Sequence, residues 1–231
     1  MGDRNRRFRC QAVIFDLDGT LVDSEGRTDE VISSLLEAEG LELSQAGELG
    51  RFHGATWQTI AAELTALIPA LSKRPLSDEL QRLFQADLVR NPPPEIPGAR
   101  ATLTAAAQHH PTAIVTSSNR ESLDLALVHL GVVDLRLTTV CSEDVRRSKP
   151  APEGYLLAAQ KLGVLPSLCL VFEDSERGLA AARAAGMPAI AIAHRCRASH
   201  RRLLTSRALM VISDYTELPA GFFREPGPET V

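Results

Sequence analysis

The sequence predicts an α/β protein with a Rossmann-like core, built on a parallel sheet covered by helices, and a small α-helical cap. Two observations indicate this fold. After residue 98, short apolar runs rich in β-branched residues alternate with segments of helical periodicity, and such alternation is typical of parallel sheets. Before that point, residues 25–90 show helical periodicity alone. We therefore expect residues 1–24 and 91–231 to form the core domain and residues 25–90 the cap domain.

The first expected strand is Ala12 to Phe15, an apolar run that stops at the sequence Asp-Leu-Asp-Gly-Thr. Three helices should follow in the cap, where apolar residues recur at helical spacing. They cover Val31 to Ala38, Ile60 to Leu67 and Leu80 to Leu88. Pro69 and Pro75 should separate the second helix from the third, because proline breaks a helix.

A stiff, proline-rich connector from Asn91 to Gly98 leads back to the core. Four helices are expected after it, at Arg100 to His109, Arg120 to Leu130, Pro152 to Leu162 and Arg177 to Ala185. The strands between and after them are expected at Thr112 to Thr116, Leu137 to Val140, Leu168 to Phe172, Ala189 to Ala193 and, more weakly, Ala208 to Ile212. The proline- and glycine-rich end after Leu218 should fray.

Composition narrows the class of protein. A net charge of −4 argues against a nucleic-acid surface, and the basic cluster from Arg4 to Arg9 is expected to be a solvated tail. No apolar run reaches the length of a membrane span or forms a signal peptide, so we expect a cytoplasmic protein that binds no membrane. Four cysteines without metal-ligand spacing are expected to be free thiols. A monomer is the default for this size.

Chemically active side chains follow the expected strands. In order, they are Asp16, Asp18 and Thr20; Thr116, Ser117, Ser118 and Asn119; Lys149, which precedes a helix; and Glu173 and Asp174. Because the carboxyl ends of parallel strands meet at one edge of a sheet, we expect these groups to converge there. Each alone has a simpler interpretation, such as a helix cap or a solvated loop lysine. Their joint order along one sheet favours an active site.

These residues suit the hydrolysis of a phosphate monoester. Asp16 and Asp174 would hold Mg²⁺, together with the backbone carbonyl of Asp18 and Glu173 through a water. Asp16 would attack phosphorus as the nucleophile. Asp18 would serve as general acid and base. Lys149, Thr116 and the neighbouring Ser117, Ser118 and Asn119 would bind the phosphoryl oxygens.

Four segments resemble the motifs of the haloacid dehalogenase-like superfamily. They are Asp16 to Glu25, Val115 to Asn119, Lys149 to Pro152 and Phe172 to Ser175. The resemblance implies a Mg²⁺-dependent enzyme with an aspartyl-phosphate intermediate and a helical cap of the first subclass, which closes over the substrate. Asp18 favours phosphatases over dehalogenases, which lack it. Within the superfamily, the segment from Gly54 to Trp57 and that from Lys149 to Met187 look most similar to β-phosphoglucomutase-like proteins, especially bacterial fructose-1-phosphate and 6-phosphogluconate phosphatases.

The chain departs from this branch at two positions. Thr28 stands where mutases and several of the phosphatases carry a histidine, and Trp57 stands where mutases carry an arginine that grips a second phosphate. The absence of that arginine favours hydrolysis over the mutase reaction. A β-phosphoglucomutase-type mutase is the alternative enzyme, and a catalytically idle binding protein is the alternative of another class.

Residues near the cap opening would contact a small-molecule phosphate ester, and sequence alone does not rank them. They are Glu25, Arg27, His53, Thr56, Trp57 and Gln58. His53 could bind substrate or lie on the cap surface, and Trp57 could contact substrate or pack in the cap core. The cap is expected to move on hinges near Asp23 to Gly26 and Asn91 to Gly98.

Overall fold

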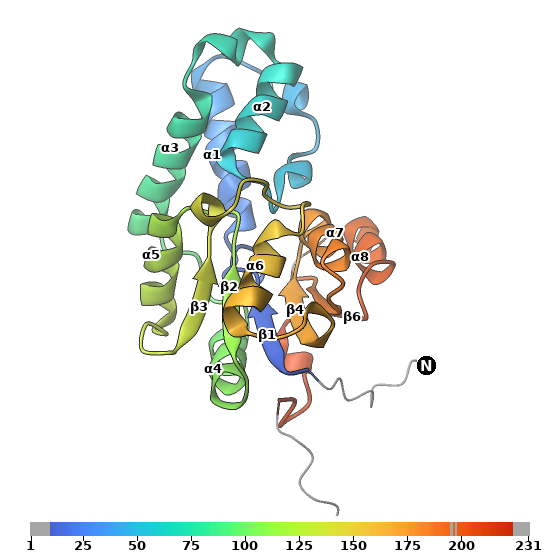
Figure 1. Cartoon of the computed structure of the whole chain (residues 1–231). Helices are drawn as coiled ribbons and strands as arrows, with labels where there is room; N and C mark the ends of the chain where they lie inside the picture. Colours follow the sequence, from blue (N-terminus) through green and yellow to red (C-terminus); the bar gives the residue numbers. More distant parts are fainter. Residues whose placement is uncertain (1–9, 195, 197, 224–231) are drawn as a thin grey trace, which may run out of the picture.

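The computed structural model describes residues 10–194, 196 and 198–223 (Figure 1). Its centre is a six-stranded sheet in the order β3-β2-β1-β4-β5-β6, in which every neighbouring pair is parallel. The strands are β1 (Ala12–Phe15), β2 (Thr112–Val115), β3 (Leu137–Val140), β4 (Cys169–Glu173), β5 (Ala189–Ile192) and β6 (Met210–Ile212). The predicted parallel sheet is confirmed, with each strand close to its predicted place.

Helices cover both faces of this sheet. The helices of the core are α4 (Ala99–His109), α5 (Arg120–Leu130), α6 (Glu153–Leu162), α7 (Glu176–Ala184) and α8 (Ala198–Thr205). Alternate residues of β1 belong to two separate apolar clusters: Val13 and Phe15 pack with α4 and α5, whereas Ala12 and Ile14 pack with α6 and α7. Helix α8 was not predicted, because its short sequence contains two arginines and, among residues 201–205, Leu204 alone is buried.

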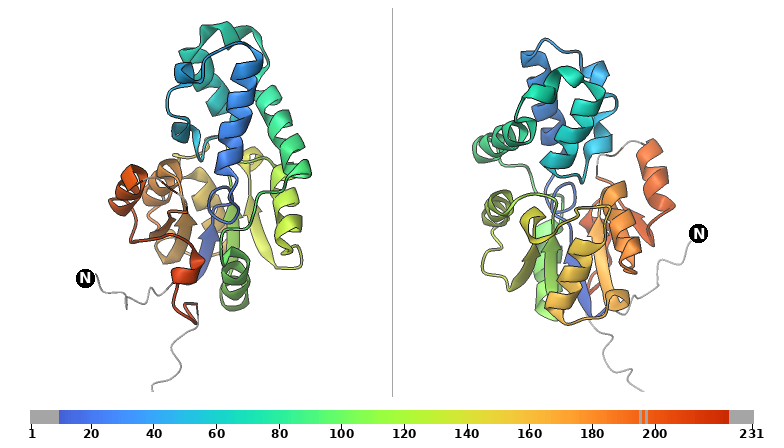
Figure 2. Two further views of the ribbon diagram at one scale, coloured as in Figure 1. Left: turned by 180° about the vertical axis from the view of Figure 1, so that it is seen from behind. Right: turned by 45° about the horizontal axis from the view of Figure 1, so that its top comes forward.

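A second group of helices lies beyond the carboxyl ends of the strands (Figures 1 and 2). It consists of α1 (Glu25–Ala38), α2 (Trp57–Leu67) and α3 (Leu76–Arg90), which pack around an apolar cluster of their own. The three cap helices are therefore present where periodicity predicted them. Pro69 does more than end a helix, because it begins the 3-10 turn η3 (Pro69–Lys73). The remaining 3-10 turns are η1 (Leu43–Ala46), η2 (Leu49–Phe52), η4 (Ser142–Asp144), η5 (Pro166–Leu168) and η6 (Tyr215–Glu217).

The two connectors between the helical group and the sheet run side by side. The backbone N–H of Asp23 donates to the carbonyl of Pro94 (2.9 Å), and that of Ile96 donates to the carbonyl of Leu21 (3.0 Å). The segments predicted as hinges are therefore adjacent. Hinge movement itself stays a prediction.

None of the helices in the described part of the chain combines the length and apolar character needed to cross a membrane. The predicted cytoplasmic location and monomeric state stay predictions. The basic cluster from Arg4 to Arg9 and residues 224–231 of the end expected to fray lie outside the described residues.

Candidate active site

Asp16 stands at the end of β1, almost completely buried. Its backbone N–H donates to the carbonyl of Phe172 in β4 (3.0 Å), so strand pairing fixes its position beside the end of that strand. Lys149 reaches it from the segment before α6, and its Nζ donates to Asp16 Oδ1 and to Glu173 Oε1. The structure thus brings together three predicted site residues from segments far apart in the sequence.

Glu173 is fully buried and its carboxylate is held at both oxygens. Oε1 accepts from Lys149 Nζ and from the Tyr155 hydroxyl (2.8 Å). Oε2 accepts from the backbone N–H groups of Asp174 and Ser175 and from Ser175 Oγ, each at 3.0 Å. Ser175 also caps α7, since its Oγ accepts from the N–H of Gly178 (3.0 Å). One turn therefore begins the helix and fixes the acid.

Burial is the largest influence on the pKa values of the acids and the lysine in this cluster. Removal from water raises the pKa of Asp16 to about 8, although the ammonium of Lys149 opposes that rise. Burial alone would lower the pKa of Lys149, but the carboxylates of Asp16 and Glu173 raise it above its ordinary value, so the ammonium form is retained. Burial, followed by the nearby charge of Glu25, raises the pKa of Asp174 well above its usual range. A cluster of buried acids of this kind favours the binding of a proton or a metal cation.

The donor set fits Mg²⁺. Asp16, Glu173 and Asp174 each offer a carboxylate oxygen, and these oxygens lie within 4.8 Å of one another. Mg²⁺ prefers oxygen ligands and usually binds through one or two carboxylates together with phosphate oxygens and water. The Thr20 hydroxyl donates to Asp174 Oδ1 (3.2 Å) and so helps to orient it. Gly19 leaves room for this acid, because a Cβ there would lie 2.1 Å from Asp174 Oδ2.

Three hydroxyl groups hold Asp18. Ser24 Oγ donates to its Oδ1 (2.7 Å), while Ser118 Oγ (2.7 Å) and Thr116 Oγ1 (3.2 Å) donate to its Oδ2. Thr116 and Ser118 were predicted to bind phosphoryl oxygens, and in this structure their hydroxyls bind the Asp18 carboxylate, which is a strong acceptor. Asp18 is therefore fixed by the same segments that supply the phosphate-binding candidates.

The other two residues of the predicted hydroxyl cluster have different partners. Ser117 Oγ donates to the carbonyl of Gly54 in the helical group (2.9 Å), so it joins the sheet to the cap. Asn119 Oδ1 accepts from the N–H of Ser122 (3.1 Å) and caps α5, which favours the capping interpretation weighed from sequence. Thr116, Ser117 and Lys149 nevertheless line one pocket, together with Tyr155.

The two cap residues predicted to contact substrate, Trp57 and His53, have different surroundings. Trp57 is 8% exposed and its ring lies 5.1 Å from that of Phe84, so its position favours packing in the cap core. A substrate contact by its indole stays a prediction. His53 Nε2 lies 3.2 Å from Asp29 Oδ1 and 3.7 Å from Glu25 Oε2, at the base of the cap. Glu25 also accepts from the N–H of Gly54 (3.2 Å), immediately beside His53.

Sequence reasoning assigned no role to Ser24 or Tyr155, both of which contact site residues. It considered Ser175 only as a helix cap, and in the structure Ser175 caps α7 and also holds Glu173. Ser24 and Ser175 lie within the quoted motifs, so their spacing offered a signal. Tyr155 offered little, because it stands on the apolar side of a helix and resembles an ordinary core residue.

A sequence model of the haloacid dehalogenase-like hydrolases matches residues 10–186. The chain belongs to the haloacid dehalogenase-like hydrolases. Fructose-1-phosphate phosphatase YqaB of Escherichia coli (strain K12) is 31% identical over 182 residues, which cover 79% of this chain and 96% of that protein. The prediction of this family, and of a phosphatase within it, is confirmed.

Solved structures agree with this membership. A HAD family hydrolase from Deinococcus radiodurans R1, determined with bound phosphate and sodium, is 33% identical, with a TM-score of 0.67 over 93% of this chain and 95% of that chain. A β-phosphoglucomutase from Clostridium difficile is 18% identical, with a TM-score of 0.73 over 92% of this chain and 95% of that chain. At that identity the second likeness shows the shared fold alone.

Proposed function

We propose that the protein is a Mg²⁺-dependent phosphatase that hydrolyses a small sugar phosphate, or a related phosphomonoester, through an aspartyl-phosphate on Asp16. One observation carries the proposal: the buried Asp16 carboxylate meets a buried ammonium, Lys149, within a cluster of acids whose oxygens suit a divalent cation. Groups suited to act as the nucleophile, as a ligand for phosphoryl oxygens and as metal ligands therefore lie together, which supports the proposal.

The reaction divides into two displacements at phosphorus. An Asp16 oxygen attacks phosphorus, the bond from phosphorus to the leaving oxygen breaks, and Asp18 supplies the proton that makes the leaving group an alcohol. A water molecule then gives a proton to Asp18 and attacks the same phosphorus. The bond from phosphorus to Asp16 breaks, which releases inorganic phosphate and restores both carboxyl groups.

Other side chains prepare these steps. Within the described part of the chain, carboxylates engage two of the three N–H donors of Lys149, which leaves one for a phosphoryl oxygen. Asp18 would turn from its hydroxyl partners toward the leaving oxygen. When bound by Asp16, Asp174 and the Asp18 carbonyl, with Glu173 through a water, Mg²⁺ would reduce the repulsion between the nucleophile and the phosphate.

Residues 25–90 would act as the cap that closes over the substrate. Gly54 lies against the sheet edge, with its carbonyl bound by Ser117 and its N–H by Glu25, so this loop would form the roof above the phosphoryl group. Trp57 packs inside the cap, in the place where mutases carry a phosphate-gripping arginine, which favours hydrolysis over the mutase alternative. The activity named for the Escherichia coli relative supports a sugar phosphate as substrate.

Phosphate release from a panel of sugar, polyol and nucleotide phosphates, with Mg²⁺ and with EDTA, tests the proposal. We expect metal-dependent release from one group of substrates, and none from the Asp16→Asn variant. Asp134→Asn is the matched control, because Asp134 is exposed in a turn far from the site. Release that is unaffected by EDTA or retained in Asp16→Asn would contradict the proposal. Exchange of glucose-phosphate isomers without net release would favour the mutase.

A further inference from the structure

Tyr155 contacts the catalytic cluster but has no part in the proposed reaction. It lies on α6, six residues after Lys149, and its side chain is 0% exposed. Its hydroxyl donates to Glu173 Oε1 (2.8 Å), the same oxygen that accepts from Lys149. Its ring faces the ammonium, with Lys149 Nζ 5.2 Å from the ring centroid. One side chain therefore contacts both members of the ion pair.

The Glu173 carboxylate has little freedom to turn. Three donors from the β4–α7 turn hold Oε2, and the backbone of Gly178 approaches the carboxylate so closely that a Cβ there would lie 1.7 Å from Oε1. Among the residues that the structure describes, Tyr155 supplies the one neutral donor at Oε1. If that donor were lost, Oε1 would attract the ammonium more strongly, and Lys149 would shift toward Glu173 at the expense of Asp16.

We propose that Tyr155 is a positioning residue whose hydroxyl fixes Glu173 Oε1 and thereby aims the Lys149 ammonium at the phosphoryl group transferred to Asp16. This inference rests on the proposed function, because it assigns Lys149 to the phosphoryl group. Burial, followed by the charge of Glu173, raises the pKa of Tyr155 well above its ordinary value, so the phenol keeps the proton that it donates.

The chain offers a matched pair of variants, since it has two tyrosines and both are buried. Tyr155→Phe removes only the hydroxyl and keeps the ring beside Lys149. Tyr215→Phe removes a hydroxyl that has no hydrogen-bond partner among the described residues. With the panel substrate that the wild type hydrolyses fastest, Tyr155→Phe should lower kcat about ten-fold, and Tyr215→Phe should leave kcat unchanged.

Three readouts separate positioning from a merely structural role. In Tyr155→Phe, both KM and the inhibition constant of inorganic phosphate should stay within about two-fold of wild type, because ground-state binding is kept. Rates are normalised to the folded fraction measured by circular dichroism. In a Glu173→Asp background, whose shorter side chain withdraws the carboxylate from the hydroxyl, Tyr155→Phe should cost less than about two-fold.

Several results would overturn the inference. Wild-type kcat in Tyr155→Phe would do so while leaving the phosphatase proposal intact. A loss in Tyr155→Phe that appears wholly in KM, or that recurs in full in the Glu173→Asp background, would show that Tyr155 acts on something other than Lys149 and Glu173. Absence of phosphate release from the wild type with Mg²⁺ would instead refute the proposed function, and this inference with it.

Discussion

Gly178 makes the packing around Glu173 directly testable, because alanine should have opposite effects at two helical glycines. In the first turn of an ordinary helix, glycine to alanine stabilises by up to about 1 kcal/mol. Gly26, at the start of α1, meets that description, since a Cβ there would have nothing within 4 Å. At Gly178 the same methyl would lie 1.7 Å from Glu173 Oε1 and 1.8 Å from its carboxyl carbon.

The cost at Gly178 follows from what must move. Carbon and oxygen atoms need roughly 3.5 Å between them, so the Glu173 carboxylate would have to leave its place. Its displacement breaks a buried network of five hydrogen bonds, two of them at Oε1 and three at Oε2. Disrupting a buried charged pair costs about 3–5 kcal/mol. After the gain from helix propensity, we expect Gly178→Ala to lower the free energy of unfolding by about 3 kcal/mol.

Urea unfolding followed by circular dichroism measures this difference. For a chain of this size, about 3 kcal/mol corresponds to a fall in Tm of about 6–12 °C. Gly178→Ala should show the lower urea midpoint at an unchanged slope, whereas Gly26→Ala should equal or exceed wild type. Activity should fall about 100-fold in Gly178→Ala, because Lys149 loses its anchor. Wild-type stability in Gly178→Ala would refute the account of Glu173 as a pinned, fully bonded acid.

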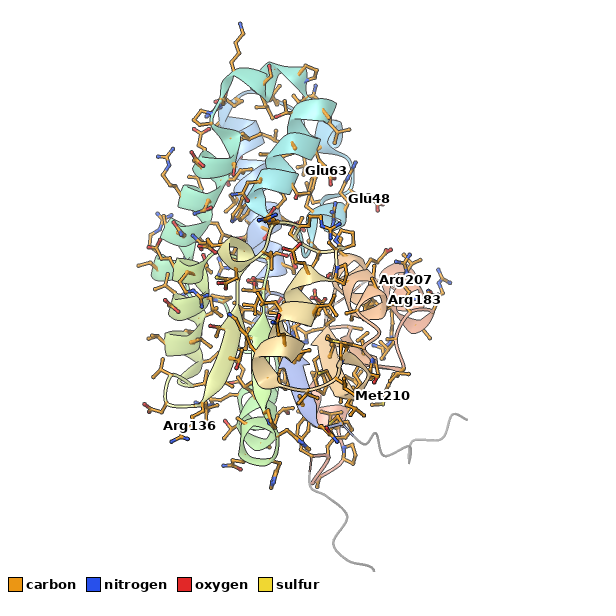
Figure 3. All side chains as sticks on the ribbon, viewed as in Figure 1. Glu48, Glu63, Arg136, Arg183, Arg207 and Met210 are labelled. Atoms are coloured by element: carbon orange, nitrogen blue, oxygen red, sulfur yellow. The ribbon has the colours of Figure 1, made fainter. Side chains whose placement is uncertain are left out.

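Three further predictions concern pH, cap closure and Asp18. In EDTA, the free energy of unfolding should fall as pH rises from about 4 to about 8. Burial raises the pKa of Asp16 from 3.8 to about 8. Over this pH range the folded protein therefore retains a proton that the unfolded chain gives up. Thermal melts should show a smaller fall with Mg²⁺, and equal curves would contradict the metal assignment. Glu63, on the side of α2 that faces α7 (Figure 3), forms an ion pair with Arg177 that links the cap to the core. Glu63→Gln should therefore raise KM up to about five-fold at low salt and less at high salt. The control Glu30→Gln affects an ion pair within α1 and should leave KM unchanged. Ser24→Ala removes the 2.7 Å hydrogen bond to Asp18 and should lower kcat about five-fold, measured with saturating substrate; an unchanged kcat would show that Ser24 does not orient the general acid.

The sequence predicted the sheet well because its signals were local. Each strand is a short apolar run. In β1, successive side chains point to opposite faces of the sheet, so Val13 and Ile14 pack in different apolar clusters. The meeting of Asp16, Lys149 and Glu173 also followed from sequence, since parallel strands place their carboxyl ends at one edge. Helix α8 was not predicted because few of its residues are apolar. The packing of Leu204 against the core, rather than a periodic apolar pattern, stabilises this helix.

Hydrogen-bond partners were harder to predict than positions. The sequence did not predict that the hydroxyls of Thr116 and Ser118 donate to Asp18, a carboxylate and therefore a strong acceptor. Phosphate binding by these two residues stays a prediction. Asn119 and Trp57 each had two interpretations from sequence. Asn119 caps α5 through a local contact with Ser122, three residues further on. Trp57 packs against Phe84, which is distant in the sequence and is brought near it by folding. Tyr155 could not be distinguished from a core residue without knowing that its hydroxyl reaches Glu173 at the end of β4.

The central claim is that Asp16 carries the phosphoryl group, and trapping that group tests it most directly. Enzyme mixed with a substrate labelled with ³²P on the phosphate would be quenched in acid within one turnover, digested and analysed by mass spectrometry. The account predicts one hydroxylamine-sensitive label on the peptide that contains Asp16, and no label in Asp16→Asn. Phosphate release by wild-type enzyme with no labelled protein at any quench time, or with the label on another residue, would contradict it.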